Sequence, residues 1–159
     1  MDNPLYRFAT AFDTDGIMKG LLEILFLEEQ QTNFFSEEKK QEQDHIMRCA
    51  IEKNNIIIAE NEKEVIGFIW FNVTNKCFYG LDYGNLENQY MFISYIWVLE
   101  PFRNKGIAQQ LYDKVIDYAK ENTIKKIWLD IYMSNEKSIN FHKKLGFTPQ
   151  IMLYSKNIL

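Results

Sequence analysis

One stretch constrains the fold more than any other: an apolar run that passes through a short basic turn into a helix. Residues 90–99, YMFISYIWVL, are typical of a buried strand, and the apolar residues from Ile107 onward have helical spacing. Between them lie Arg103, Lys105 and Gly106. A helix N-terminus leaves N–H groups unpaired and carries a partial positive charge, so phosphate suits it. The stretch therefore predicts an α/β fold, and its basic turn is either an anion site or an ordinary solvated connection.

The rest of the chain alternates helical and extended patterns without a repeat or a linker. Residues 55–73 contain two apolar runs about a polar turn, which predicts a hairpin in which Gly67 marks a bulge or a close approach. Ser36 and Asn135 (or Ser134 beside it) predict helix starts. The predicted elements, in chain order, are strand 6–12, helix 16–30, helix 37–53, the hairpin 55–73, strand 90–98, helix 105–121, strand 125–133, helix 136–145 and one or two strands in 147–159.

Composition bounds the function classes. The 159 residues suit one domain, 1–159, and the 47% hydrophobic share suits a packed core. A net charge of −4 argues against general nucleic-acid binding, which needs a basic face. Cys49 and Cys77 are too few for a disulfide framework and predict free thiols in a reducing compartment. His45 and Cys49 could share a helix face, but two ligands do not make a metal site, so no metal is expected.

No membrane or export segment is expected. The apolar stretch IMKGLLEILFL, residues 17–27, contains Lys19 and Glu23 and is too short and too charged to span a bilayer. It predicts an amphipathic helix, and a cytoplasmic location follows by default.

Two spaced motifs resemble a known family. The P-loop and dinucleotide-binding fingerprints are absent. The pattern R-x-x-G-x-A at residues 103–108 instead resembles the acetyl-CoA signature [QR]-x-x-G-x-[GA] of the GNAT superfamily of N-acetyltransferases. That family has an asparagine, a short helix and F-Y-x-x-x-G-F about 30 residues downstream. Here the matching residues are Asn135, Phe141, Gly146 and Phe147.

The resemblance extends over nearly the whole chain and implies a fold and a co-substrate. The fold would be a mixed, mostly antiparallel central sheet with helices on both faces. The co-substrate would be acetyl-CoA, with its pantetheine arm pairing with the splayed end of the strand and its pyrophosphate cradled by the turn. The residues implied in binding it are Ile96, Trp97, Val98, Arg103, Asn104, Lys105, Gly106, Ile107, Ala108 and Asn135. A plain helix cap explains Asn135 equally well, and a core position explains Val98.

The catalytic groups depart from the family pattern. The family places tyrosine after the phenylalanine of F-Y as a general acid, and this chain has His142. Histidine can donate a proton near neutral pH, so the substitution could keep the role, or His142 could be a packing residue. The strand 90–98 carries no Asp or Glu to act as general base. A water chain to Glu87 or Asp82 could take the amine proton, although each carboxylate is explained as well by loop solvation.

The expected function is transfer of the acetyl group of acetyl-CoA to a primary amine by direct attack in a ternary complex. A small amine is the expected acceptor, because the chain is acidic and residues 77–90 mix aromatic rings with Asp82 and Glu87. One alternative is a protein acetyltransferase acting on lysine or the N-terminus. Another is a catalytically weak acyl-CoA-binding domain, which CoA release with any amine would exclude. The pattern fits a monomer or a homodimer equally.

Overall fold

The computed structural model describes residues 3–32, 36–76 and 89–156. The chain forms two compact units, Met1–Leu129 and Asp130–Leu159. The first unit holds the sheet, and the second holds one helix and the C-terminal segment.

The first unit is built on a five-stranded sheet in which the strands lie side by side in chain order. Neighbouring strands are antiparallel except the last pair, β4 and β5, which is parallel. The predicted mixed, mostly antiparallel sheet is therefore confirmed. The strands are β1 (Leu5–Phe8), β2 (Ile56–Asn61), β3 (Glu64–Thr74), β4 (Tyr90–Val98) and β5 (Lys126–Trp128).

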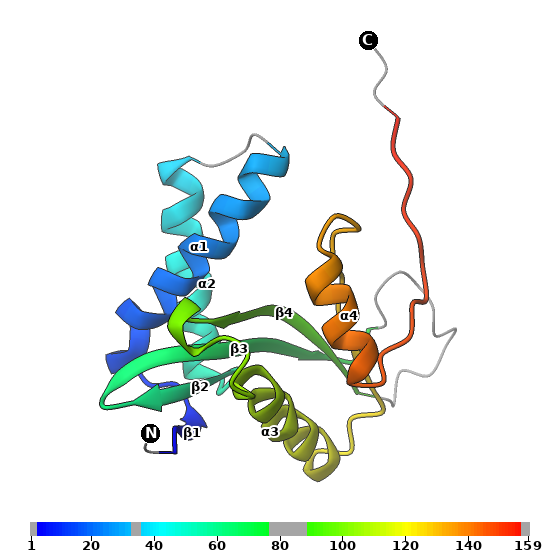
Figure 1. The fold of residues 1–159 in the computed structure, drawn as a ribbon. Helices are drawn as coiled ribbons and strands as arrows, with labels where there is room; N and C mark the ends of the chain where they lie inside the picture. The colour runs from blue at the N-terminus through cyan, green and yellow to red at the C-terminus, as the bar shows by residue number, and fades with distance from the viewer. Residues whose placement is uncertain (1–2, 33–35, 77–88, 157–159) are drawn as a thin grey trace. The chain divides into compact units, whose positions relative to one another are not determined.

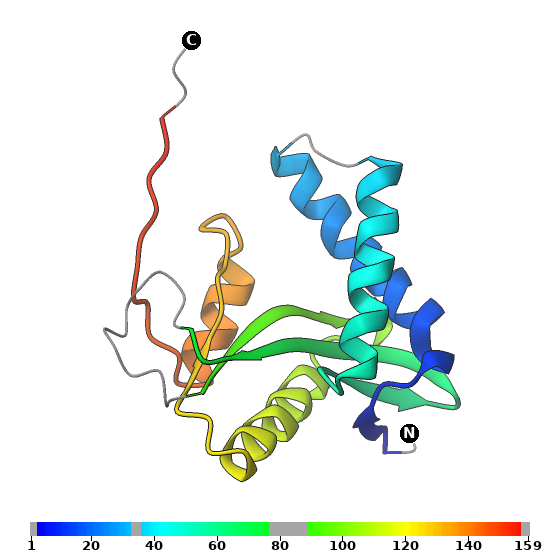
Figure 2. The ribbon, with the colours of Figure 1, turned by 180° about the vertical axis from the view of Figure 1, so that it is seen from behind.

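Helices cover both faces of this sheet, as predicted. Figures 1 and 2 show α1 (Thr14–Thr32) and α2 (Glu37–Glu52) on one face and α3 (Ile107–Glu121) on the other. The α1 and α2 side bears the buried core cluster, in which helix residues such as Ile17 and Met47 pack with strand rings such as Trp70. Burial of such side chains is the main stabilising contribution, about 1.5–3 kcal/mol each before entropy is counted. Ser36 caps α2 as predicted, its hydroxyl accepting a hydrogen bond from the Lys39 N–H at 3.3 Å.

Gly67 is both a bulge and a close approach. The β2–β3 register steps from Ala59 opposite Gly67 to Glu60 opposite Val65, which leaves an extra residue on β3. A Cβ on Gly67 would lie 3.0 Å from the Trp97 carbonyl oxygen and 3.3 Å from the Ile107 side chain. Glycine here lets the start of α3 settle directly onto the sheet.

A second bulge interrupts β4 in the middle. Tyr95 lies opposite Trp70, but Ile93 lies opposite Phe71, so Ser94 has no residue across from it. The Ser94 hydroxyl instead accepts a hydrogen bond from the Asn72 amide at 2.9 Å. Past this bulge, β4 continues to Val98 without β5 beside it.

The end of the chain differs from the prediction. β5 covers only three residues of the predicted strand 125–133, and residues 147–156 form no strand. Alternating apolar residues form a strand only when a neighbour supplies hydrogen bonds, and β4 offers β5 a partner over Tyr90–Phe92 alone. Within the described residues, Ile151 to Tyr154 are exposed. The second unit keeps the predicted helix, α4 (Glu136–Lys144), and Gly146 follows its C-cap residue Leu145 with φ +89°.

Among the described residues, no helix combines the length and the apolar character needed to cross a bilayer.

Candidate active site

The C-terminal half of β4 presents an open backbone edge. β5 pairs with β4 only from Tyr90 to Phe92, so beyond that point the two strands separate. The Leu99 N–H donates to the Ile66 carbonyl at 2.9 Å, which makes that pair hydrogen-bonded in an antiparallel ladder. Alternation then places Val98 and Ile96 in non-hydrogen-bonded pairs, with their N–H and C=O groups directed away from β3. Two of the three predicted strand residues, Ile96 and Val98, thus direct backbone groups away from β3, whereas Trp97 pairs with β3 and is buried.

The chain leaves this edge through a tight turn that ends at the start of α3. A short 3-10 turn, η3 (Glu100–Phe102), is closed by the Arg103 N–H donating to the Glu100 carbonyl at 3.1 Å. Asn104 and Gly106 follow with φ of +61° and +82°, in the left-handed region that asparagine tolerates and glycine adopts freely. The turn stays beside the end of β4, because the Arg103 Nε donates to the Val98 carbonyl at 2.8 Å.

The N-terminus of α3 is uncapped. Gly106 is the cap residue and has no side chain to accept a hydrogen bond, and the first turn holds no acidic residue. The Gly106 carbonyl receives the Gln110 N–H at 3.0 Å, so the helix ladder starts there. The N–H groups of Ile107, Ala108 and Gln109 have no acceptor among the described residues. A Cβ on Gly106 would meet nothing within 4 Å, which leaves room for an anion against these donors.

The two basic side chains of the turn are engaged elsewhere. The Arg103 Nε donates to the Val98 carbonyl at 2.8 Å, and its Nη2 lies 3.6 Å from a Glu23 carboxylate oxygen. The Lys105 ammonium lies 5.3 Å from the centre of the Phe102 ring. The donors that face the open space are therefore backbone N–H groups.

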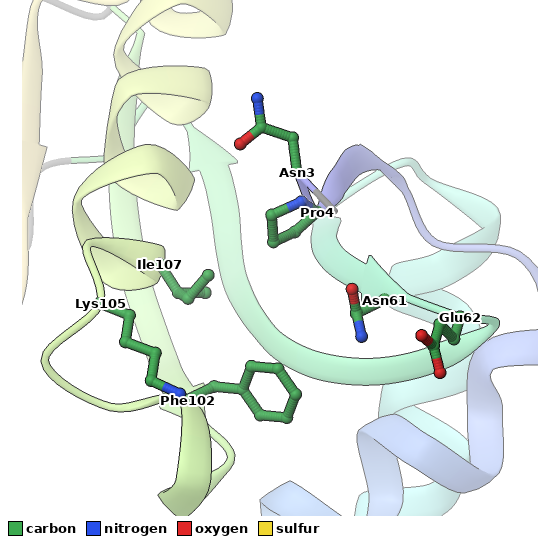
Figure 3. A pocket seen from close by; sticks show the side chains of 7 residues that line it. All are labelled: Asn3, Pro4, Asn61, Glu62, Phe102, Lys105 and Ile107. Carbon is green, nitrogen blue, oxygen red and sulfur yellow. The ribbon is translucent and has the colours of Figure 1, made fainter. Parts of the chain in front are cut away.

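A surface pocket of about 240 Å³ adjoins the turn (Figure 3). The Lys105 side chain extends along it toward Phe102, and the β2–β3 turn closes its other side. None of its lining residues belongs to β4, so it is separate from the open strand edge. The lining residues are Asn3, Pro4, Asn61, Glu62, Phe102, Lys105 and Ile107.

The second unit holds the other two predicted residues. Asn135 caps α4, its side-chain oxygen accepting the Ser138 N–H at 3.1 Å. His142 is buried between the rings of Phe141 and Phe147. Burial lowers its pKa, and the hydrogen bond with the Ser138 backbone opposes this only in part. Because a carbonyl can only accept, the 2.7 Å contact with the Ser138 oxygen places a proton on Nδ1.

The geometry of turn, edge and helix agrees with a family match. The model of the acetyltransferase (GNAT) family matches residues 21–147. The chain belongs to that family. The resemblance inferred from residues 103–108 and 135–147 is thereby confirmed.

Relatives of this GNAT chain are distant in sequence. An uncharacterised N-acetyltransferase, YycN of Bacillus subtilis (strain 168), is 24% identical over 98 residues. The match covers 62% of the chain and 57% of YycN, so the chain matches little more than half of that relative.

Solved structures share the fold over almost the whole chain. A mutant BH1408 protein from Bacillus halodurans has a TM-score of 0.83 at 17% identity, over 98% of this chain and 99% of that one. The aminoglycoside acetyltransferase AAC(6')-Iy, solved with a CoA-containing bisubstrate analogue, has a TM-score of 0.71 at 18% identity, over 99% and 100%. A ribosomal-protein-alanine N-acetyltransferase from Brucella melitensis biovar Abortus has 0.67 at 16%, over 98% and 99%. At these identities the likeness shows the GNAT fold alone.

Some residues singled out in the sequence lie outside the described residues. These are Asp82 and Glu87, the candidate base or amine-orienting groups, and Cys77 with the neighbouring aromatics. Cys49 is a free thiol whose Sγ lies 3.9 Å from His45 Nε2. Over the described ranges, no three His, Cys, Asp or Glu side chains are grouped to hold a metal ion.

Sequence reasoning missed Glu23. From the sequence, the charge of Glu23 only argues that residues 17–27 do not span a membrane. In the structure its carboxylate accepts the Trp97 indole N–H at 2.7 Å and faces Arg103. The two hydrogen-bond partners are 74 residues apart, and no local pattern announces such a contact.

Proposed function

We propose that this GNAT protein transfers the acetyl group of acetyl-CoA to a primary amine by direct attack in a ternary complex. The amine nitrogen would attack the thioester carbonyl, the C–S bond would break, and CoA would leave as thiolate. The amine proton must go to a base and the thiolate must gain a proton, so that amide and free CoA are the products.

One observation carries the co-substrate assignment: an open strand edge that leads directly into an uncapped helix N-terminus. The N–H and C=O groups of Ile96 and the N–H group of Val98 suit the amides of a pantetheine arm, which would add as a pseudo-strand. The Val98 carbonyl already accepts a hydrogen bond from Arg103. The N–H groups from Asn104 to Ala108 suit the oxygens of a pyrophosphate. In the chain, only residues 99–106 lie between the end of β4 and the start of α3, so one extended ligand could use both.

A small amine is the proposed acceptor. The net charge of −4 favours cationic ligands in the protein's field. The structural neighbours include an aminoglycoside acetyltransferase, which acts on such amines, and also a ribosomal-protein acetyltransferase. A protein acceptor is therefore the second candidate. Asp82 and Glu87 are proposed as the groups that orient or deprotonate the amine.

We propose His142 as the general acid, under a condition set by its surroundings. Because burial lowers its pKa, the imidazole is neutral at neutral pH with its proton on Nδ1, bonded to Ser138. The leaving thiolate would take its proton from the imidazolium form, which is the minor form above that lowered pKa. The pH dependence of kcat is therefore diagnostic of the role.

An acceptor screen with thiol detection tests the function. The purified chain and acetyl-CoA would be mixed with polyamines, amino sugars, lysine peptides and peptides with free N-termini. We expect small amines to give kcat/KM above about 10³ M⁻¹s⁻¹, at the low side of the enzyme range. Acetylation of peptides alone would overturn the small-amine assignment. CoA binding without thiol release from any amine would favour the binding-domain alternative.

A further inference from the structure

We infer that Glu23 on α1 and Arg103 in the turn form a brace that holds the acetyl-CoA site in shape. Arg103 is then a positioning residue and not a ligand of the phosphates. The inference rests on the proposed function, because it concerns the same turn. It assigns a role to α1, which no motif of the sequence connects to the co-substrate.

The first part of the brace is the packing of the Trp97 ring between the sheet and α1. Its ring is buried, stacks on Phe68 with centroids 5.9 Å apart, and lies against α1 at Gly20. A Cβ on Gly20 would lie 2.4 Å from the Trp97 ring, so only glycine lets the helix come this close. The indole N–H then donates to Glu23 at 2.7 Å. Glu23, although 43% exposed in its side chain, is thereby fixed in direction by a buried ring.

The second element is the double attachment of Arg103. Its Nε donates to the Val98 carbonyl at 2.8 Å, and its Nη2 faces Glu23 at 3.6 Å. Both attachments are made to β4 and α1, and the helix N-terminus of α3 takes part in neither. The side chain therefore spans the turn from its middle to the last residue of the strand. It fixes the point at which the open strand edge passes into the left-handed residues Asn104 and Gly106.

The charge of Glu23 makes the inference testable through the direction in which CoA affinity changes when that charge is removed. A carboxylate near a site for a polyanion should weaken binding, so simple electrostatics predicts tighter CoA binding when Glu23 is neutralised. At exposed positions in ordinary salt this gain should be about twofold at most. A brace predicts the opposite, because neutralising Glu23 releases Arg103. The two accounts thus differ in direction and not only in size.

Glu23→Gln is the decisive variant, since an amide oxygen can still accept the Trp97 N–H while the charge that holds Arg103 is gone. We expect its dissociation constant for CoA, by calorimetry, to rise about fivefold, the effect of losing about one kcal/mol of positioning. The KM for acetyl-CoA should rise in parallel while kcat and the melting temperature stay unchanged. Glu121→Gln is the matched control, because it removes the same charge at the far end of α3, about 21 Å along the helix. Tighter or unchanged CoA binding in Glu23→Gln, relative to this control, would overturn the brace.

Arg103→Met separates positioning from direct contact. We expect about a tenfold loss of CoA affinity by calorimetry, because the turn loses its attachments to both Val98 and Glu23. Adding Glu23→Gln to Arg103→Met should cause no further loss, because both changes break one brace. A further loss in the double variant, as large as the loss that Glu23→Gln causes alone, would show that the two residues act independently and would overturn the inference. Absence of CoA binding in the unmodified protein would overturn the proposed function instead, so the two failures are distinguishable.

Discussion

The two helices that follow a strand-like segment, α3 and α4, begin in opposite ways. α4 is closed at its N-terminus: the Asn135 side chain accepts the Ser138 N–H, and Glu136 lies in the first turn. α3 is open: its cap residue is Gly106, and no acid lies in its first turn. A side-chain cap contributes about 1 kcal/mol to helix stability, and α3 forgoes it. A helix N-terminus can thus be capped by a side chain, as in α4, or left without a cap, as in α3, where we propose that a ligand binds. The residue at the cap position decides which.

Replacing the cap glycine of α3 should have the largest effect. Gly106→Val puts a β-branched residue at φ +82°, which costs about 1–2 kcal/mol in the left-handed region and turns the first N–H groups away. Losing two charge-assisted hydrogen bonds should weaken CoA binding about 10³-fold. The space above Gly106 is open, so the reason is backbone conformation and not collision with the protein. Gly146→Val at the end of α4, with φ +89°, is the control: similar destabilisation in thermal melts, without that loss in calorimetry.

The contribution of α4 should come from a side chain and not from its N-terminus. His142→Phe should lower kcat about 10²-fold with little change in the KM for acetyl-CoA, if His142 is the general acid. In the unmodified enzyme, kcat should fall as the pH rises through the lowered pKa of His142, because the imidazolium is lost. The Phe variant should lack that limb of the steady-state pH profile.

A packing role for His142 leaves a different trace. Its folded-state pKa lies below the unfolded value of about 6.5, so between the two the unfolded chain binds more protons. Stability should then decline as the pH falls through this window, and His142→Phe should flatten the decline in denaturant titrations. Flattening together with unchanged kcat would make His142 a packing residue.

Making α3 resemble α4 should have a moderate effect. Gln109→Glu places an acid in the first turn, where the helix dipole stabilises it by about 0.3–1 kcal/mol. The same carboxylate competes with and repels the phosphates, so CoA affinity should fall about tenfold. The reverse change in α4, Glu136→Gln, should slightly lower the melting temperature and leave CoA affinity unchanged. Unaltered affinity in Gln109→Glu, measured by calorimetry, would show that the anion does not bind at the start of α3.

The smallest effect is expected at the cap of α4. Asn135→Ser keeps a side-chain oxygen for the Ser138 N–H, so the melting temperature should hardly change. If the Asn135 amide also reaches the co-substrate, CoA affinity should fall about fivefold, the value of one hydrogen bond. Asn135→Ala should bind CoA as weakly as Asn135→Ser does, and it should also lose about 1 kcal/mol of folding stability. An affinity equal to that of the unmodified protein in both variants would reduce Asn135 to a cap.

Local signals predicted the elements that local chemistry builds. Ser36 and Asn135 marked helix starts correctly, since a cap depends on residues three positions away. Gly67 was expected at a bulge or a close approach and occupies both. The prediction of strands in residues 147–159 was wrong for the described residues 147–156, which form no strand. An alternating sequence does not indicate whether a partner strand lies beside it.

Long-range features could not be predicted from the residues. The bulge at Ser94 shifts the register of β4 by one residue, so that Tyr95 pairs with Trp70 and Ile93 pairs with Phe71. Tyr95 thereby packs against the core cluster on the α1 side of the sheet. No residue type marks that step. The Glu23–Trp97 contact joins residues 74 positions apart, and the roles of both depend on a packing that only the folded sheet defines.

The order of the strands has a consequence for how the site comes into being during folding. Although β1 to β5 lie in chain order, their pairings differ in sequence distance: two residues separate β2 from β3, whereas β1 pairs with β2 across 55 positions, from Leu5 to Glu60. The parallel pairing of β5 with β4 is different, since it must wait until α3 has crossed the sheet. Chains of this topology gain their early contacts locally and their parallel contacts late. We therefore expect the hairpin of β2 and β3 to form first and the pairings of β1 and β5 to form last, so that a nascent chain released before Trp128 would already contain both the end of β4 and the start of α3.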